Sequence, residues 1–104
     1  MKELKFQLVI QFSEPSTLEE FDALIKLETA LISATEMFVD GHDSGMGEFN
    51  IFIHTNEPRS TLEQAGALIR TLKPDLHFVA GYRDFAENDY IPLWPPNLQS
   101  FAVA

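Results

Sequence analysis

FQLVIQ at Phe6–Gln11 and FNIFIH at Phe49–His54 are the two stretches that decide the fold. In both stretches every second residue is large and apolar, and the residues between them are mostly polar. A period of two is typical of a β-strand that buries one face. The sequence therefore predicts two half-buried strands, whose core-facing side chains are Phe6, Leu8, Ile10 and Phe12 in the first and Phe49, Ile51 and Ile53 in the second.

The similarity between the two stretches continues along the chain in both halves. Ser16–Glu19 and Ser60–Glu63 share the letters STLE, and FVDGH at Phe38–His42 corresponds to FVAGY at Phe78–Tyr82. The matching segments are 43 residues apart for Phe6 and Phe49, 44 for Ser16 and Ser60, and 40 for Phe38 and Phe78. Self-similarity at a nearly constant spacing indicates a repeated structural unit. We therefore expect an internal duplication in which each half runs strand, helix, strand.

Each predicted helix follows a Ser-x-x-Glu run, which has the pattern of a capping box. Beyond each run, apolar residues recur at spacings of three and four, as on one face of an amphipathic helix. In the first helix that face is interrupted by one charge, Glu28, and Pro74 ends the second helix. The faces comprise Phe21, Leu24, Ile25, Glu28, Leu31 and Ile32 in the first helix and Leu62, Ala65, Leu68, Ile69 and Leu72 in the second.

Two strand–helix–strand units with right-handed crossovers can be fused so that their first strands are neighbours. The result is an α+β, ferredoxin-like βαββαβ domain with an antiparallel sheet and both helices on one face. The segment Asp89–Pro96 is predicted to return as a short fifth strand, which Pro92 restricts to an edge. A length of 104 residues fits one domain. We assign it to residues 1–96, with a loosely held tail at residues 97–104.

Composition excludes several classes of partner. The 16 acidic residues outnumber the 7 basic ones, for a net charge of -9, and the cations form no run, so we expect no nucleic-acid partner. The chain has no cysteine, which excludes disulfides and thiolate chemistry. No apolar run approaches the length of a membrane span and no leader pattern opens the chain, so we expect a cytoplasmic protein without a membrane partner. No pattern predicts a cofactor.

The densest polar cluster lies between the second and third predicted strands, where three glycines indicate a long hairpin loop over residues 40–48. Carboxylates and an imidazole can bind a ligand or a divalent cation, although the spacing matches neither an EF-hand nor a histidine pair. A solvated hairpin remains the simpler interpretation. The candidate ligand-binding residues here are Asp40, His42, Asp43 and Glu48, of which His42, Asp43 and Glu48 are the candidate metal ligands.

The face of the predicted sheet that no helix covers has a mixed character. It carries amides, one aromatic ring and one imidazole and no cluster of cations, which excludes an RNA-binding sheet. Such a face is more often a dimer interface, or a surface covered by a tail, than the floor of a catalytic site. The segment with Tyr90 and Trp94 is the expected cover here. The residues expected on this face are Gln7, Val9, Gln11, Asn50, Phe52 and His54. Asn50, His54 and Trp94 complete the set of candidate ligand-binding residues.

The run Val39–Asp43, with Gly45, Gly47 and Glu48, leads into Asn50–Thr55, and Leu93-Trp94-Pro95 follows near the end. This combination, which spans most of the chain, resembles a family of small bacterial proteins of uncharacterised function. The resemblance implies a bacterial, cytoplasmic origin. It implies no activity and no role for any residue.

Three functions fit these patterns. The first, which we favour, is a binding or interaction module, a homodimer that uses the open sheet face or the 40–48 loop to hold a protein or a small molecule. The second is a small metal-dependent or acid/base enzyme centred on the same loop, for which no catalytic residue can be assigned. The third is an immunity-type or regulatory protein whose acidic surface blocks a basic partner.

Overall fold

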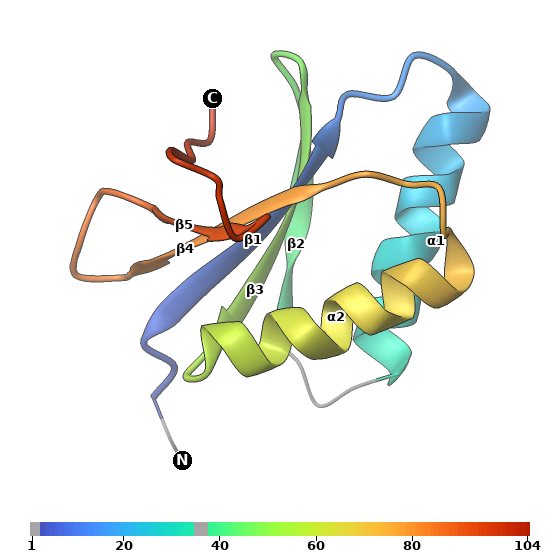
Figure 1. Cartoon of the computed structure of the whole chain (residues 1–104). Helices are drawn as coiled ribbons and strands as arrows, with labels where there is room; N and C mark the ends of the chain where they lie inside the picture. The colour runs from blue at the N-terminus through green and yellow to red at the C-terminus, as the bar shows by residue number, and fades with distance from the viewer. Residues whose placement is uncertain (1–2, 35–37) are drawn as a thin grey trace.

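The structure is a computed structural model that describes residues 3–34 and 38–104. Two helices and five strands follow one another in the order βαββαββ (Figure 1). The elements are β1 (Phe6–Ser13), α1 (Leu18–Ala34), β2 (Phe38–Gly45), β3 (Glu48–Thr55), α2 (Pro58–Leu72), β4 (Val79–Asp84) and β5 (Ile91–Trp94). Among the described residues, no helix has the length and apolar character needed to span a membrane.

The strands form one sheet in the order β2-β3-β1-β4-β5. Every pair of neighbours is antiparallel, and β1, in the middle, pairs with β3 on one side and β4 on the other (Figure 1). This confirms the α+β class and the antiparallel sheet. It also confirms a fifth strand beside β4, where Pro92 lies at the edge of the sheet.

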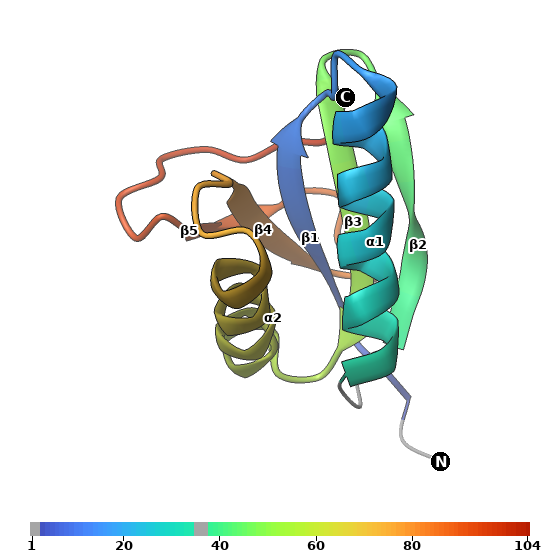
Figure 2. The same ribbon diagram turned by 90° about the vertical axis from the view of Figure 1, so that its right-hand side faces the viewer.

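The core lies between one face of the sheet and the two helices, which stand in front of the strands in Figure 2. The alternating residues of β1 and β3 are buried there as predicted. In α1 the predicted apolar face is partly wrong, because Leu27 is buried and Ile32 is exposed. Leu24, Leu27 and Leu31 form a row at spacings of three and four, and Ile32 lies outside that row. The core comprises Leu8, Ile10, Phe12, Leu24, Leu27, Leu31, Phe49, Ile51, Ile53, Leu62, Ala65, Ile69, Ala80 and Leu93.

The predicted starts of both helices need correction. In α1 the capping box is shifted by one residue: the Glu20 N–H donates to Thr17 Oγ1 at 3.1 Å, and the Glu20 carboxylate accepts the Ser16 N–H at 3.0 Å. In α2 the Ser60–Glu63 box is wrong. That helix begins at Pro58, and its N-cap residue, Glu57, makes no side-chain capping bond. Proline suits the first helical position because its missing N–H would have no partner there, so α2 begins before the serine.

The α1 cap makes stability depend on pH. The hydrogen bond from the Ser16 backbone N–H, followed by the bond from its hydroxyl, lowers the pKa of Glu20 below its ordinary value of 4.5. A lowered pKa means that the folded state favours the carboxylate, so this contribution is complete above pH 4.5 and disappears as pH falls through the folded pKa. We expect Glu20→Gln to lower the free energy of unfolding near neutral pH. In urea titrations at several pH values, the difference from the wild type should shrink in acid, and a difference independent of pH would contradict this.

The predicted long loop over residues 40–48 is wrong. β2 continues to Gly45 and β3 begins at Glu48, so only two residues form the turn. Met46 has φ 54° and Gly47 has φ 86°, and two left-handed residues are the mark of a tight hairpin turn. Of the three glycines that indicated a loop, Gly41 and Gly45 lie within β2 and Gly47 is in the turn. A register shift between Val39 and Gly41 forms a bulge in β2. Residues 40–45 therefore belong to a strand, and beyond the bulge the residues from Gly41 to Gly45 alternate between its two faces.

The turn residue Met46 adopts a left-handed backbone conformation that is unfavourable for a residue with its side chain. A left-handed conformation costs an ordinary L-residue about 1–2 kcal/mol, whereas asparagine tolerates it. Met46 is 86% exposed, so its side chain adds little packing to offset this. We expect Met46→Asn to raise the free energy of unfolding by about 0.5–1 kcal/mol in urea titrations. No gain, with Gly47 unchanged, would contradict the assigned turn.

Candidate functional site

The open face of the sheet, on the side away from the helices, carries most of the candidate residues. Side chains alternate along each strand, so residues between the core positions of β1 and β3 point to this face. Two groups of side chains occupy it. The amide–carboxylate row consists of Gln11, Asp43, Glu48 and Asn50, and the aromatic–histidine row consists of Phe38, His54, Gln7 and Arg83.

Asn50 is the centre of the amide–carboxylate row. It pairs with Gln11 of β1 on one side and Asp43 of β2 on the other. Its Nδ2 donates to Asp43 Oδ1 at 3.0 Å and to Glu48 Oε1 at 3.1 Å, and its Oδ1 accepts the Gln11 Nε2–H at 3.0 Å. Asn50 is only 1% exposed, and three of its hydrogen-bonding positions are used. Its amide therefore holds two carboxylates and one amide in fixed positions.

Residues 97–104 lie across this row. Gln11 Nε2 donates to the Ala102 carbonyl oxygen at 3.0 Å, and the Ala104 N–H donates to Glu48 Oε1 at 3.0 Å. Phe101 lies directly on Gly81 of β4, where a Cβ atom would come within 2.5 Å of the ring. Val9, the strand partner of Gly81, is fully buried although it points to the open face. The tail therefore covers this half of the face.

His54 is the centre of the aromatic–histidine row. The Phe38 ring stacks on it at 5.1 Å, and the Phe85 ring meets it edge-on at 4.9 Å. His54 Nε2 lies 3.7 Å from Asp40 Oδ2. Both flanking phenylalanines face solvent, Phe38 with 54% and Phe85 with 40% of its surface exposed. This half of the open face therefore presents aromatic rings around an imidazole.

Arg83, at the β4 end of the same row, is held in place by several contacts. Its Nε donates to Gln7 Oε1 at 3.0 Å and its Nη1 donates to the Glu87 carbonyl oxygen at 3.0 Å. Its guanidinium lies 5.3 Å from the Phe85 ring centre and 5.8 Å from that of Tyr90, within cation–π distance. The row therefore has an acid, Asp40, at its β2 end and a fixed cation at its β4 end.

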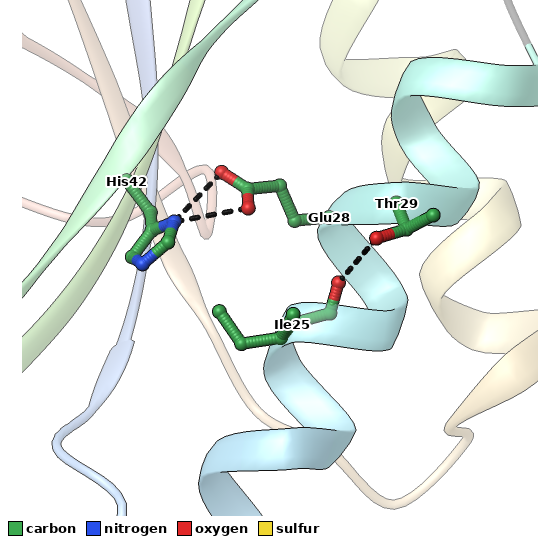
Figure 3. A network of polar contacts seen from close by, with 4 residues as sticks. All are labelled: Ile25, Glu28, Thr29 and His42. Carbon is green, nitrogen blue, oxygen red and sulfur yellow. Dashed lines mark hydrogen bonds and ion pairs between the residues drawn. The ribbon is translucent and has the colours of Figure 1, made fainter.

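His42 lies on the opposite, helix-facing side of the sheet, paired with Ile51. Its Nδ1 is 2.9 and 3.0 Å from the two Glu28 carboxylate oxygens (Figure 3). Its ring stacks on that of Phe49 at 5.0 Å. Glu28 is only 7% exposed. The acidic side chain that interrupts the apolar face of α1 is therefore buried, and its hydrogen-bond partner is His42 on β2. A carboxylate at Nδ1 orients the ring and favours the tautomer with a proton there.

The structure divides the sequence-predicted residues among four places. Asp43, Glu48 and Asn50 converge under the tail, and Asp40 and His54 lie together in the other half of the open face. His42 is on the helix side, and Trp94 of β5 stacks on Phe78 at 6.4 Å, apart from both rows. Within residues 3–34 and 38–104, no group of three or more histidine, cysteine or acidic side chains is arranged to hold a metal.

Three residues of these sites were not recognised from the sequence. Glu28 was seen only as an interruption of an apolar face, and its partner could be inferred only if residue 42 were placed on a strand. Phe85 follows Arg83 by two residues and so shares its face, which was a usable signal. Gly81, a glycine within a predicted strand, indicated a close approach to the backbone, but not that the approaching ring comes from residue 101.

Comparisons of the chain with protein-family models, with curated proteins and with solved structures give no match.

Proposed function

We propose that the protein is a non-enzymatic interaction module and that a second copy of the chain docks on its aromatic–histidine row. The observation that carries this proposal is the exposure of Phe38 and Phe85 on either side of His54. In a domain with helices on one side only, the other side of the sheet is free to pack against another layer. Exposed rings gathered on such a face are typical of an interface.

Charge supports a second copy as the occupant. A two-fold axis parallel to the strands, between β1 and β3, brings β2 of one subunit over β4 of the other. Asp40, at the β2 end of the row, then faces Arg83 of the partner subunit, and the same contact occurs twice. Two such pairs offset part of the repulsion between chains of net charge -9.

At the level of the fold, we propose a ferredoxin-like domain. The order β2-β3-β1-β4 with antiparallel neighbours is the order that two fused strand–helix–strand units would produce, and β5 is an addition at the β4 edge. The matching halves of the sequence support an internal duplication. The resemblance to small bacterial proteins supports a bacterial, cytoplasmic origin. Because this fold carries many unrelated functions, the functional proposal depends on the open face instead.

The enzymatic alternative has less support. A metal or acid/base centre built from His42, Asp43 and Glu48 would need them on one side of the sheet. His42 contacts Glu28 on the helix side, and the other two contact Asn50 on the open face. An acidic, partner-blocking protein is supported by net charge alone.

Light scattering after size exclusion tests the proposal. We expect a mass of about twice 11.8 kDa for the wild type and a dimer dissociation constant about tenfold higher for Asp40→Lys. Asp40 is exposed and its contact with His54 is 3.7 Å long, so the substitution should leave the fold intact. Asp22→Lys makes the same charge change on the exposed side of α1 and should remain dimeric. A monomeric wild type, or equal effects of the two substitutions, would disprove the proposed interface.

A further inference from the structure

We infer that the half of the open face under residues 97–104 is a binding groove for an extended peptide segment of a partner protein, and that the tail is its displaceable internal occupant. The tail shows which chemistry the groove accepts: a backbone carbonyl, a backbone N–H and an aromatic ring. The proposed self-association uses the other half of the face, and the two halves meet at Tyr90, whose ring contacts both Phe101 and the Arg83 guanidinium.

The groups that receive the tail backbone are fixed without it. Gln11 and Glu48 are both hydrogen-bonded to the buried Asn50, at 3.0 and 3.1 Å. Each of them then binds one backbone group of the tail, Gln11 the carbonyl of residue 102 and Glu48 the N–H of residue 104. A donor and an acceptor that are already positioned bind a peptide at a lower entropic cost than mobile side chains would.

An aromatic ring supplies the apolar part of the contact. The ring of Phe101 occupies the space above Gly81 that a side chain would fill, and it meets the Tyr90 ring at 5.4 Å. The groove thus binds a simple pattern of groups in the peptide. They are an aromatic side chain, the backbone carbonyl of the next residue, and the backbone N–H of the residue three positions after the aromatic one. Asp43 and Glu48 at this end favour a neutral or basic segment over an acidic one.

Among the described residues, no strand pairing holds the tail to the sheet. The strands end with β5 at Trp94, so residues 97–104 do not extend the sheet. The two hydrogen bonds between tail and sheet join backbone to side chain in exposed surroundings. An internal segment competes at an effective concentration near the millimolar range, so an external peptide binds weakly until the tail is released. The apparent affinity then rises in proportion to the fraction of open grooves.

Fluorescence anisotropy with a labelled, amidated peptide of sequence Asn-Leu-Gln-Ser-Phe-Ala-Val-Ala tests the inference on the full chain. We expect Phe101→Ala, which removes the ring of the internal competitor, to bind this peptide about tenfold more tightly than the wild type does. The same peptide with alanine in place of phenylalanine should not bind. Adding Gln11→Ala to Phe101→Ala should weaken binding several-fold, and adding Gly81→Leu, which fills the space above Gly81, should abolish it.

Two results would overturn the inference. One is that the Phe101→Ala chain binds the phenylalanine peptide no better than the alanine peptide. The other is that saturating peptide converts a dimeric Phe101→Ala chain to a monomer in light scattering, because the groove would then belong to the tail of a second copy.

Discussion

Replacing His42 with leucine is expected to lower the free energy of unfolding by about 2–3 kcal/mol. Nδ1 of His42 lies 2.9 Å from a Glu28 carboxylate that is almost completely buried. Without the imidazole, that buried carboxylate loses its hydrogen-bond partner at Nδ1. Urea titration near neutral pH, followed by far-ultraviolet circular dichroism, measures the loss.

The double variant Glu28→Leu/His42→Leu is the matched control. Only Glu28 of this pair is buried, since the His42 side chain is 31% exposed. Replacing both hydrogen-bond partners with apolar side chains is often neutral or stabilising, because no buried polar group is then left without a partner. We therefore expect the double variant to regain most of the stability that His42→Leu loses. If both variants were equally destabilised, the loss would come from the ring contact with Phe49 and not from the unpaired carboxylate.

Replacing Phe49 with alanine is expected to cost about 3–5 kcal/mol. Phe49 is fully buried, and its ring meets those of His42 at 5.0 Å, Phe21 at 5.9 Å and Phe12 at 6.5 Å. Alanine would leave a cavity where β1, β2, β3 and α1 meet, since the surrounding side chains can collapse only partly. The free energy of unfolding from urea titration is again the measurement.

Phe38→Ala tests whether the ring of Phe38 contributes to the proposed interface and not to the core. It removes the same side chain from an exposed position of β2, so the unfolding free energy of the monomer should change by about 0.5 kcal/mol or less. Its effect should appear in the dimer dissociation constant instead. A loss of monomer stability as large as that of Phe49→Ala would show that the open face belongs to the core.

The strand and core positions could be predicted because their signal is local. Phe49, Ile51 and Ile53 recur at a spacing of two, and the polar Asn50 and His54 flank this set on the other face, so the period places the three residues on the buried face. The fifth strand was also predictable, because Pro92 can be accommodated at an edge. These features depend on residues that are close together in the chain.

The candidate site was predicted incorrectly because the local structure of residues 40–48 was predicted incorrectly. Gly41, Gly45 and Gly47 indicated a long loop in which neighbouring polar residues can gather. In the strand that the structure shows, adjacent residues point in opposite directions, so His42 and Asp43 are separated by the sheet. The assignment of Ser60 as a helix cap failed in a similar way, because Pro58 offered an earlier start.

Side-chain contacts between elements distant in sequence could not be predicted. The placement of Phe101 on Gly81 and the bond between Glu28 and His42 depend on how whole elements pack. A glycine in a strand indicates that something approaches closely, but it does not identify what approaches.

Cross-linking two single-cysteine chains tests the paired open faces most directly, since the wild-type chain has no cysteine. Glu87 is exposed beside the Arg83 guanidinium, so Glu87→Cys leaves that arginine in place. A bis-maleimide with a reach of about 10 Å, the spacing of packed sheets, should link the Asp40→Cys chain to the Glu87→Cys chain. The account predicts a covalent dimer of about twice 11.8 kDa in the mixture and little in either chain alone, because equivalent residues lie at opposite ends of the interface. No dimer in the mixture, or as much dimer in either chain alone, would contradict it.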